Sequence, residues 1–402
     1  MRTLLARAAR PLAGGLALSL LLAAPAGAQA PQPPAPLPGP LPLFPPDNWW
    51  NADVSSAPVD PSSAGFLALI GGTTSLHPDF GGDDPGTPNG VYGMVYAVVP
   101  GTEPLEVVDF SDGYPTESDT GAPGRPPGYP IPTAARTEPR WIEGGQPGGG
   151  ASGDRHMLLV DRDRRILYEL YATRWNTVAS RWTADSGAVF LLDGNGRRPE
   201  GWTSADAAGL AILPGLVRYD EVFGPDPIRH AFRVTVRFTR GHVFPASHTA
   251  SNSSDPYALP MGARLRLKAA KDISGHPTPV RKIFQAMKTH GLIVADNGSN
   301  LYVSGAYDPR WDNDVLNPAF ASLKASDFEV VERGWKPPAA TSTGPTDFYT
   351  LPPCRLLDTR LPPGPAGGPA LPPGSDRVLV VAGRCGVPAT ARALALNVTV
   401  VA

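Results

Sequence analysis

Cysteine is scarce in this chain, and its placement limits what it can do. Cys354 and Cys385 are the two cysteines among 402 residues. The long stretch before them therefore has neither a disulfide framework nor a cysteine-rich metal site, and it must be stable through packing alone, as a domain of ~300 residues can be. In an exported protein such a pair is typical of a disulfide, which we expect here.

Long apolar runs are also rare. The first 30 residues contain one apolar run of roughly a dozen residues. Three arginines precede this run, and small residues near a possible cleavage point follow it. This pattern predicts a Sec-type signal peptide over 1–30 and a secreted or surface-attached bacterial protein. No other run approaches the ~20 apolar residues that a membrane helix needs, so we expect no membrane span after signal cleavage.

A strong excess of one charge is missing as well. The chain has 35 Lys and Arg against 37 Asp and Glu, and the predicted signal removes Arg2, Arg7 and Arg10. The mature chain is therefore slightly acidic, which argues against broad electrostatic attraction to nucleic acid. We expect a monomer whose partner is a polysaccharide or a cell-surface glycan.

Proline and glycine are abundant instead. With 49 prolines and 44 glycines, the chain must contain many turns and few long helices. The fold class that follows is mainly β, with a minor α+β character. We expect an antiparallel β-sandwich or jelly-roll-like main domain with one or two helices.

Composition also divides the chain. Residues 31–42 carry seven prolines and predict an extended linker. The main domain then covers 43–333, and a second linker rich in Pro, Thr and Ser covers 334–347. A C-terminal module covers 348–402.

Several elements can be read within the main domain. Apolar residues at helical spacing predict a helix over 279–290, which Thr278 caps and Gly291 ends. Further expected elements are a helix in SAGFLALIGG ended by Gly71, a helix near 318–324, a hairpin with its turn at 161–164, a hairpin around Asn297-Gly298, strands over 228–238 and 263–268, and a loop over 111–153 held by Tyr114, Tyr129 and Trp141.

The C-terminal module has a recognisable pattern. Its sequence contains PCRLLDTR, GPAGGP, CGVPATA and ALNVTV. These segments resemble the first half of a β-sandwich module that recurs in secreted bacterial proteins. The resemblance implies an incomplete copy of an attachment or spacer unit, and it implies nothing about activity.

The main domain has a resemblance of its own. It is carried by LFPPDNWWN, GDRHMLLVD, LYELY, GWTSADAAGLAILPGLVRYDEV, MGARLRLKA and GLIVADNGSN. These runs resemble a family of uncharacterised secreted bacterial proteins over residues 43–333. The resemblance assigns no catalytic residue.

Histidines on strand-like rows are the first candidate site. Alternation places His230 with the apolar row of 228–238, while His156 and His248 share parity with apolar neighbours. Together they could bind a divalent metal or supply a general base. They could equally be core histidines bonded to the backbone. No HxH or HExxH spacing favours a metal, so we predict no cofactor, although the sequence leaves a divalent metal open.

Acidic residues are the second candidate. Asp220 and Glu221 follow Arg218 and Tyr219 in RYDEV, and a strand there would point the two carboxyls to opposite faces. Either could pair with another carboxyl for glycoside hydrolysis. The possible partners are Asp154, Asp206 and Asp296. The alternative is a salt bridge to Arg218.

Other polar residues have weaker patterns. Ser186, Ser204 and Ser247 lie outside any GxSxG motif, and the segment from Thr203 to Asp206 is typical of a helix start or a turn. A basic stripe suited to an acidic polysaccharide would consist of Arg233, Arg237, Arg264, Arg266 and Lys268. The tryptophans that could stack on sugars, or lie in the core, are Trp175, Trp182 and Trp202.

The sequence therefore predicts a secreted carbohydrate-active protein, either a hydrolase or a lyase. In a lyase a histidine or Tyr219 would take the proton and an arginine would neutralise the uronate. The alternative is a non-enzymatic glycan-binding or structural protein at the cell surface. An enzyme would gather the histidines and carboxyls around one cleft, whereas a binding protein would show an aromatic face and separate, satisfied histidines.

Overall fold

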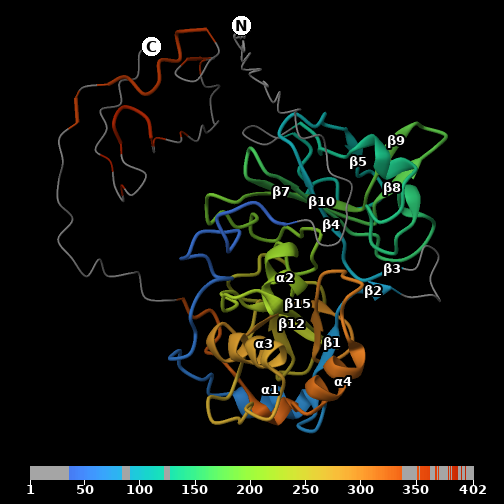
Figure 1. The fold of residues 1–402 in the computed structure, drawn as a ribbon, viewed down its shortest axis with the longest axis vertical. Helices are drawn as coiled ribbons and strands as arrows, with labels where there is room; N and C mark the ends of the chain where they lie inside the picture. Colours follow the sequence, from blue (N-terminus) through green and yellow to red (C-terminus); the bar gives the residue numbers. More distant parts are fainter. Residues whose placement is uncertain are drawn as a thin grey trace, which may run out of the picture.

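The computed structural model describes residues 36–83, 91–121 and 127–336, and scattered positions between 351 and 394. Strand residues outnumber helical ones, which confirms the β-rich class (Figure 1). The strands are joined by parallel as well as antiparallel pairs, and several neighbours in the sheets are far apart in sequence. The signal peptide predicted over 1–30 lies outside the described residues.

A six-stranded mixed sheet organises one half of the main domain. Its strands, in spatial order, are β1 (His77–Asp79), β16 (Tyr302–Ser304), β11 (Phe232–Val236), β15 (Leu292–Asn297), β14 (Arg264–Leu267) and β17 (Phe328–Val330). The pairs β1/β16 and β11/β15 are parallel, and the other pairs are antiparallel.

A four-stranded sheet organises the other half. Its order is β10 (Ser186–Leu191), β7 (Ile166–Tyr171), β6 (Met157–Asp161) and β4 (Tyr96–Val99). The predicted hairpin at 161–164 is confirmed, since β6 and β7 pair antiparallel and Asp161 faces Ile166 across the turn.

Short strands form three smaller sheets. They are β2 (Gly82–Asp83) with β3 (Val91–Tyr92), β12 (Thr239–His242) with β13 (Leu259–Met261), and β9 (Arg181–Thr183) between β5 (Val108–Asp109) and β8 (Arg174–Asn176).

Four α-helices lie among the described residues, and Figure 1 shows α1, α3 and α4 gathered around the half that contains β1 and β15. They are α1 (Ser63–Ile70), α2 (Tyr219–Phe223), α3 (Thr278–Thr289) and α4 (Asn313–Ala321). The helix predicted over 279–290 is confirmed as α3, whose buried face carries Val280, Ile283, Phe284 and Met287. Helix α1 ends before Gly71 as expected, and α4 begins earlier than the predicted 318–324.

The described residues also contain short 3-10 turns. They are η2 (Thr133–Arg136), η3 (Pro147–Gly149), η4 (Leu213–Gly215) and η5 (Ala325–Asp327).

One apolar core joins the two large sheets. Leu158 and Leu167 of the four-stranded sheet belong to the same buried cluster as Val234 and Leu292 of the six-stranded sheet. The opposite face of the four-stranded sheet is covered by a second cluster that includes Tyr129. The four-stranded sheet is therefore buried on both faces, which explains the unbroken burial of β6 and most of β7.

The described residues of the loop over 111–153 form a partly packed arm, as predicted. Tyr129 and Trp141 are buried against the four-stranded sheet, while Tyr114 remains exposed. The proline-rich stretch expected to be an extended linker is also partly packed, because Leu37 is buried in the main core and Arg165 donates to the carbonyl of Gly39 at 3.0 Å.

The hairpin predicted around Asn297-Gly298 is wrong. Strand β11 lies between β15 and β16 and pairs with both. The connection wraps around the end of β11, where Gly298 N–H donates to Val236 O at 3.1 Å and Leu301 N–H to Thr235 O at 2.9 Å. Strand β11, which comes earlier in the chain, thus lies beside β15 in the position where the predicted hairpin would have placed β16.

The alternation predicted for 228–238 is half right. Phe232, Val234 and Val236 are buried, but Arg233 is buried too, because β11 is a central strand covered on both faces. Phe238 lies beyond the end of β11 and is exposed, contrary to its expected place in the apolar row.

The C-terminal region is described only in part. The predicted disulfide between Cys354 and Cys385 is confirmed. Among the described positions of 351–394, none is assigned to a strand. The predicted NVTVV strand and most of the linker over 334–347 lie outside the described residues, so the incomplete sandwich module stays a prediction.

Candidate functional site

The segment after Trp202 forms a tight turn, one of the two structures expected for it. Ser204 Oγ accepts the Asp206 N–H at 2.9 Å and donates to Leu210 O at 2.5 Å. Gly209 has φ 73°, and a Cβ there would lie 2.1 Å from Ser247 Oγ. This turn points the Asp206 carboxyl into the protein.

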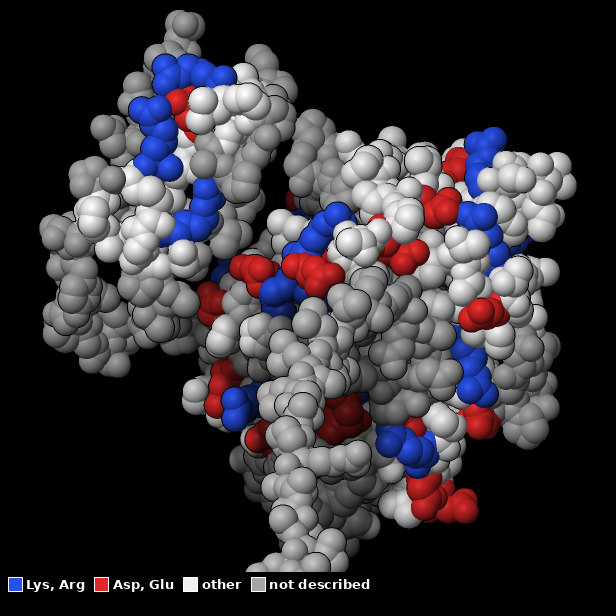
Figure 2. All heavy atoms as spheres, turned by 45° about the horizontal axis from the view of Figure 1, so that its top comes forward, with Lys and Arg blue, Asp and Glu red and all other residues white. Residues whose placement is uncertain are grey.

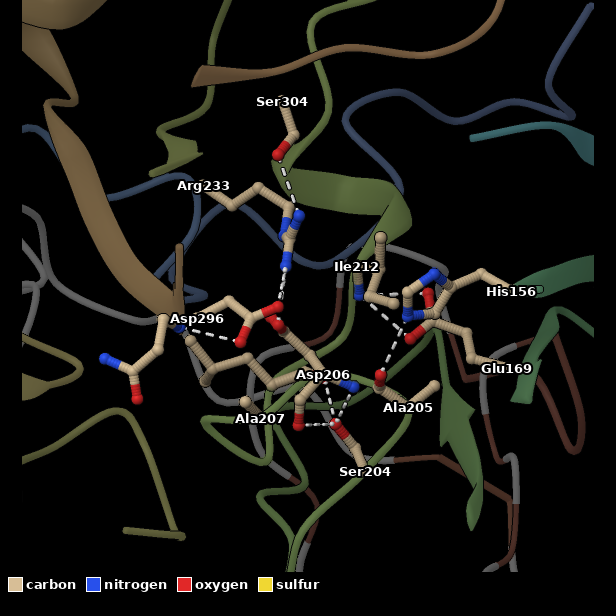
Figure 3. A network of polar contacts seen from close by, with 12 residues as sticks. His156, Glu169, Ser204, Ala205, Asp206, Ala207, Ile212, Arg233, Asp296 and Ser304 are labelled. Atoms are coloured by element: carbon tan, nitrogen blue, oxygen red, sulfur yellow. Dashed lines mark hydrogen bonds and ion pairs between the residues drawn. The ribbon is translucent and has the colours of Figure 1, made fainter. Parts of the chain in front are cut away.

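Asp206 meets an arginine from the centre of the six-stranded sheet. Arg233 Nη2 lies 2.7 Å from Asp206 Oδ1 and 3.6 Å from Asp296 Oδ2. Its Nη1 donates to Ser304 Oγ at 2.7 Å. Figure 3 shows the two carboxyls converging on one guanidinium. Strands β11, β15 and β16 therefore bring Arg233 together with Asp296 and Ser304, which lie much later in the chain.

Burial shifts the protonation of both carboxyls. It raises the pKa of Asp206 to about 6, even though Arg233 opposes the shift, and it raises the pKa of Asp296. Burial alone would lower the pKa of Arg233, but Asp206 and Asp296 outweigh it and raise that pKa. Asp206 Oδ2 and Arg233 Nε are buried without a hydrogen-bond partner among the described residues. Two carboxyls thus share one arginine, and one buried carboxyl oxygen, Asp206 Oδ2, has no hydrogen-bond donor among the described residues.

An ion pair of histidine and glutamate lies beside the turn. His156 Nδ1 is 2.6 Å from Glu143 Oε2, and His156 Nε2 is 3.2 Å from Ala205 O. Burial alone would lower the pKa of His156, but Glu143 raises it overall, and His156 in turn lowers the pKa of Glu143 against the effect of burial. We call Glu143, His156, Asp206, Arg233 and Asp296 the Arg233 centre.

A further buried carboxyl holds the other end of the turn. Glu169 in β7 is fully buried, and its Oε1 accepts the N–H groups of Ile212 at 3.0 Å and Leu213 at 2.9 Å. Burial raises the pKa of Glu169 to about 7, and the negative charge of Asp206 adds to the shift. Glu169 therefore fixes the end of the segment 203–213 through two backbone N–H groups.

The Arg233 centre reaches solvent at Asp296. The Asp296 side chain is 36% exposed, whereas the Asp206 side chain has no exposed surface. Asp154 is exposed, and its negative charge contributes to the raised pKa of Asp296. Burial, followed by the charges of Asp154, Asp185 and Asp296, raises the pKa of Tyr171. The accessible edge of the centre thus combines two carboxyls with a phenol.

A second polar group, the α2 cluster, consists of Arg218, Asp220, Glu221 and His230. Glu221 Oε2 lies 2.6 Å from Arg218 Nη2 and 3.0 Å from His230 Nε2. Burial alone would raise the pKa of Glu221, but Arg218 and His230 lower it. The expected strand at RYDEV is wrong: Asp220 and Glu221 lie in helix α2, where Glu221 also accepts the backbone N–H of Arg218 at 3.0 Å.

Tyr219 lies between two other side chains. Its ring stacks on Phe223 with centroids 4.2 Å apart, and the guanidinium of Arg310 lies 4.0 Å from the ring centroid. Trp311 packs edge-on against it. Both faces of the ring are therefore covered, and the predicted role of the Tyr219 hydroxyl as a proton acceptor stays a prediction.

The predicted histidines have separate partners. His156 and His248 both contact the turn after Trp202, His248 through Nδ1 at 2.8 Å from Ala207 O, whereas His230 belongs to the α2 cluster. Within the part of the chain that the structure describes, no group of three or more His, Cys, Asp or Glu is arranged to hold a metal ion. Of the two alternatives for these histidines, the arrangement among the described residues fits separate histidines, because each ring lies against its own backbone or carboxylate partner.

The hydroxyl groups of the three candidate serines donate hydrogen bonds to backbone carbonyls. Ser186 Oγ donates to Ser204 O at 2.7 Å, and Ser247 Oγ donates to Trp202 O at 2.9 Å. Together with Ser204, which donates to Leu210 O, they hold turns in place. These contacts support no serine nucleophile at the three positions.

The five basic residues expected to form a stripe do not form one exposed surface, because three of them are buried. Arg264 and Arg266 point to the same face of the six-stranded sheet as Arg233, but all three are buried. Arg266 pairs with Glu329, while Arg237 and Lys268 are exposed beyond their strand ends. On the face drawn in Figure 2, acidic and basic side chains are interspersed over the main domain.

The rings of the three tryptophans proposed for sugar stacking already contact other side chains of the protein. Trp182 is fully buried and packs edge-on against Trp175, whose ring lies 4.0 Å from the Arg136 guanidinium. Trp202 is partly exposed and contacts Arg198. The core alternative fits Trp182 and Trp175.

Sequence reasoning missed two residues of this region. Glu169 is a lone charge within the apolar run LYELY, and such a charge on a buried strand is a recognisable signal. Glu143 lies in the arm and has no local signal. Asp206 and Asp296 entered only as possible partner carboxyls, and Arg233 only as part of the stripe.

Comparison with protein-family models, curated proteins and solved structures finds no match for this chain. Among the described residues, none of the helices combines the length and apolar character needed to cross a bilayer. The site must therefore be interpreted from its own geometry.

Proposed function

We propose that the protein is a secreted, monomeric hydrolase of an extracellular polysaccharide, and that Asp296 and Asp154 are its catalytic carboxyls. The supporting observation is that Asp296 is the accessible carboxyl of the Arg233 centre, where burial raises its pKa and the negative charge of the exposed Asp154 adds to the shift. Glycoside hydrolysis needs such a pair, one protonated and one ionised.

The roles follow from the environments. Asp296 has the raised pKa and is the general acid that protonates the leaving oxygen. Asp154 is the second carboxylate, acting as nucleophile or as base for water. Arg233 and Asp206 are positioning residues, because both are buried, Arg233 contacts Asp296, and Asp206 holds Arg233 in place.

Hydrolysis is favoured over elimination. A lyase needs a cation that faces the substrate carboxylate, but Arg233 is 3% exposed and already paired with Asp206. The two chemistries give different products, since elimination leaves an unsaturated sugar that absorbs ultraviolet light.

The test is a reducing-sugar screen of the secreted protein against neutral and acidic polysaccharides, with Asp296→Asn and Asp154→Asn beside the wild type. Loss of either carboxyl should lower kcat by roughly 10²-fold or more. Asp220→Asn is the matched control, because Asp220 is a partly exposed aspartate in the α2 cluster, and it should keep full activity. No product on any polymer, or full activity in Asp296→Asn, would reject the proposal.

A second candidate function, glycan binding without catalysis, is favoured by a different observation. Phe223 is 53% exposed and extends the stack of Arg310 and Tyr219 at the surface. Aromatic faces of this kind stack on sugar rings. Binding on a glycan array that is lost in Phe223→Ala, together with no hydrolysis, would support this function.

Export and oligomeric state belong to the proposal too. Detection of the mature chain in the culture medium would test secretion, and light scattering of the purified protein would test the monomer.

A further inference from the structure

Asp296 stands at the end of a row of side chains that crosses four strands of the six-stranded sheet. His77 of β1 pairs with Tyr302 of β16, which in turn pairs with Thr235 of β11. Thr235 also pairs with Asp296 of β15. Side chains at paired positions lie next to each other on one face of a sheet. All four are partly exposed, so an accessible row, here called the Tyr302 row, leads away from the proposed general acid.

The Tyr302 row lies on the face of the sheet that carries the Arg233 centre. Residues two apart on a strand point to the same face, and two residues along from the row Arg233 Nη1 donates to Ser304 Oγ at 2.7 Å. The opposite face carries Val234 and Val303, which belong to the main core. The row is therefore the solvent-accessible continuation of the buried centre.

Aromatic rings dominate the far end of this row. The rings of His77 and Tyr302 have centroids 4.2 Å apart and planes inclined by 34°. Tyr92 of β3 is 49% exposed, and its hydroxyl donates to Asp79 of β1. Burial, followed by the hydrogen bond and charge of Asp79 and the charges of Glu143 and Tyr302, raises the pKa of Tyr92. Three rings thus lie close together beside the Arg233 centre.

A fourth ring approaches Asp296 from the other large sheet. Tyr171 of β7 is partly exposed, and after burial the charges of Asp154, Asp185 and Asp296 raise its pKa. Its ring centroid lies 5.3 Å from that of His156. The two proposed catalytic carboxyls therefore have aromatic rings near them from both sheets, and such rings pack against the C–H faces of sugars.

The charges around the row are mainly negative. Asp79 is partly exposed at one end, and Asp154 is exposed near the other. Arg233 is 3% exposed, and Arg155 donates to two backbone carbonyls. A chain of uronates would be repelled by the accessible carboxylates, whereas a neutral sugar chain would not.

We propose that the Tyr302 row is the substrate-binding surface of the hydrolase, and that its substrate is a neutral polysaccharide with one sugar stacked on Tyr302. Neighbouring strands are about 4.8 Å apart, so Tyr302 lies roughly 10 Å from Asp296 along the row, a distance that a short oligosaccharide spans. The inference rests on the hydrolase proposal for the position of bond cleavage, but binding along the row is measurable without cleavage.

The binding test is affinity electrophoresis of the full chain in gels that contain starch, hydroxyethylcellulose or arabinoxylan, with polygalacturonate and alginate as the acidic polymers. We expect at least one neutral polymer to retard the protein and the acidic polymers to leave its mobility unchanged. Retardation by an acidic polymer as strong as by any neutral one, or no retardation at all, would overturn the proposal.

Variants of the row locate the binding. Tyr302→Ala removes the ring and should weaken binding about three- to tenfold, whereas Tyr302→Phe keeps the ring and should bind as the wild type does. Unchanged binding in Tyr302→Ala, or an equal loss in Tyr302→Phe, would overturn stacking on this ring. His77→Ala removes the ring behind Tyr302 and should weaken binding about twofold. It keeps the test decisive if Tyr302→Ala does not fold.

The matched control is Tyr257→Ala. Tyr257 is 47% exposed and packs edge-on against Phe66 of α1, which lies beside β17 at the other edge of the sheet. This variant should leave binding unchanged, and a loss equal to that of Tyr302→Ala would overturn the placement of the sugar. Binding lost in Phe223→Ala and kept in Tyr302→Ala would place the glycan at α2 and would also overturn it.

Activity separates this inference from the hydrolase proposal. If a neutral polymer is cleaved, Tyr302→Ala should raise KM about three- to tenfold with a smaller effect on kcat. Cleavage with unchanged KM and unchanged binding in that variant would overturn the Tyr302 row alone. Binding that depends on Tyr302 without cleavage of any polymer would reject the hydrolase and support the row as a glycan-binding surface.

Discussion

The Arg233 centre and the α2 cluster both place a buried arginine among acids, but they balance charge differently. In the α2 cluster, Glu221 lies between Arg218 and His230, and its pKa is lowered. In the Arg233 centre, two carboxyls share one arginine, and both of their pKa values are raised. The first arrangement stabilises a helix, whereas the second keeps protons available where Asp296 reaches solvent. An imbalance of this kind is more typical of a functional site.

The largest expected effect comes from removing the shared cation. Arg233→Ala leaves Asp206 buried without its counter-ion and should lower the free energy of unfolding by about 3–5 kcal/mol. Arg218→Ala should cost less, because His230 remains beside Glu221. Urea unfolding of both variants at neutral pH measures the difference. Equal losses would mean that the two clusters are energetically alike.

The second prediction concerns pH. The pKa of Glu169 is raised to about 7 in the folded protein, so the folded state binds more protons than the unfolded state between about pH 4.5 and 7. Its contribution to stability therefore falls as the pH rises through this window. Glu169→Gln should remove that fall, worth up to about 3 kcal/mol. The measurement is the free energy of unfolding across this pH range, and an unchanged slope would contradict the assignment.

The opposite sign is expected in the α2 cluster. Because the folded pKa of Glu221 is lowered, its contribution is present above the ordinary glutamate pKa and is lost as the pH falls through the folded value. Glu221→Gln should cost about 1–3 kcal/mol at neutral pH and should flatten the loss of stability in acid. Thermal unfolding of wild type and variant from neutral to acidic pH tests both parts. A steeper acid loss in the variant would refute the sign.

The smallest effect should come from the surface stack beside α2. Phe223→Ala removes a half-exposed ring from its contact with Tyr219 and should cost about 0.5–1.5 kcal/mol. It should leave the pH dependence of stability unchanged, since no carboxyl is touched. A loss as large as that of Arg233→Ala would show that the α2 cluster depends on its aromatic cover.

Local patterns predicted the local elements. The spacing of Val280, Ile283, Phe284 and Met287 predicts α3, and the turn between β6 and β7 follows from two apolar runs around a charged turn. RYDEV failed because a five-residue helix has too few residues to show a period. The β15–β16 hairpin failed because β11, which arrives from elsewhere in the chain, offered better pairing to both strands.

The candidate site was predictable only in pieces. His156 and Asp154 were identified from the sequence, and they do lie at the Arg233 centre or its accessible edge. Arg218, Tyr219, Asp220 and Glu221 were identified as one group, and His230 was identified separately. The structure places the four at the start of α2 and brings His230 to Glu221. That these are two separate groups could not be inferred, because strand parity gives the face of a residue and not its distance from another strand.

The sequence by itself determined the β-rich composition, the main helices, the β6–β7 hairpin and the Cys354–Cys385 disulfide. Each of these depends on interactions between near neighbours in the chain or, for the disulfide, on the presence of two cysteines. Tertiary structure decided which charges are buried and with whom. Arg233, Arg264 and Arg266 share one face of one sheet, yet the first meets two carboxyls, the second only carbonyls and the third one carboxylate. Those partners come from strands and loops that only folding brings together, and burial then sets their protonation.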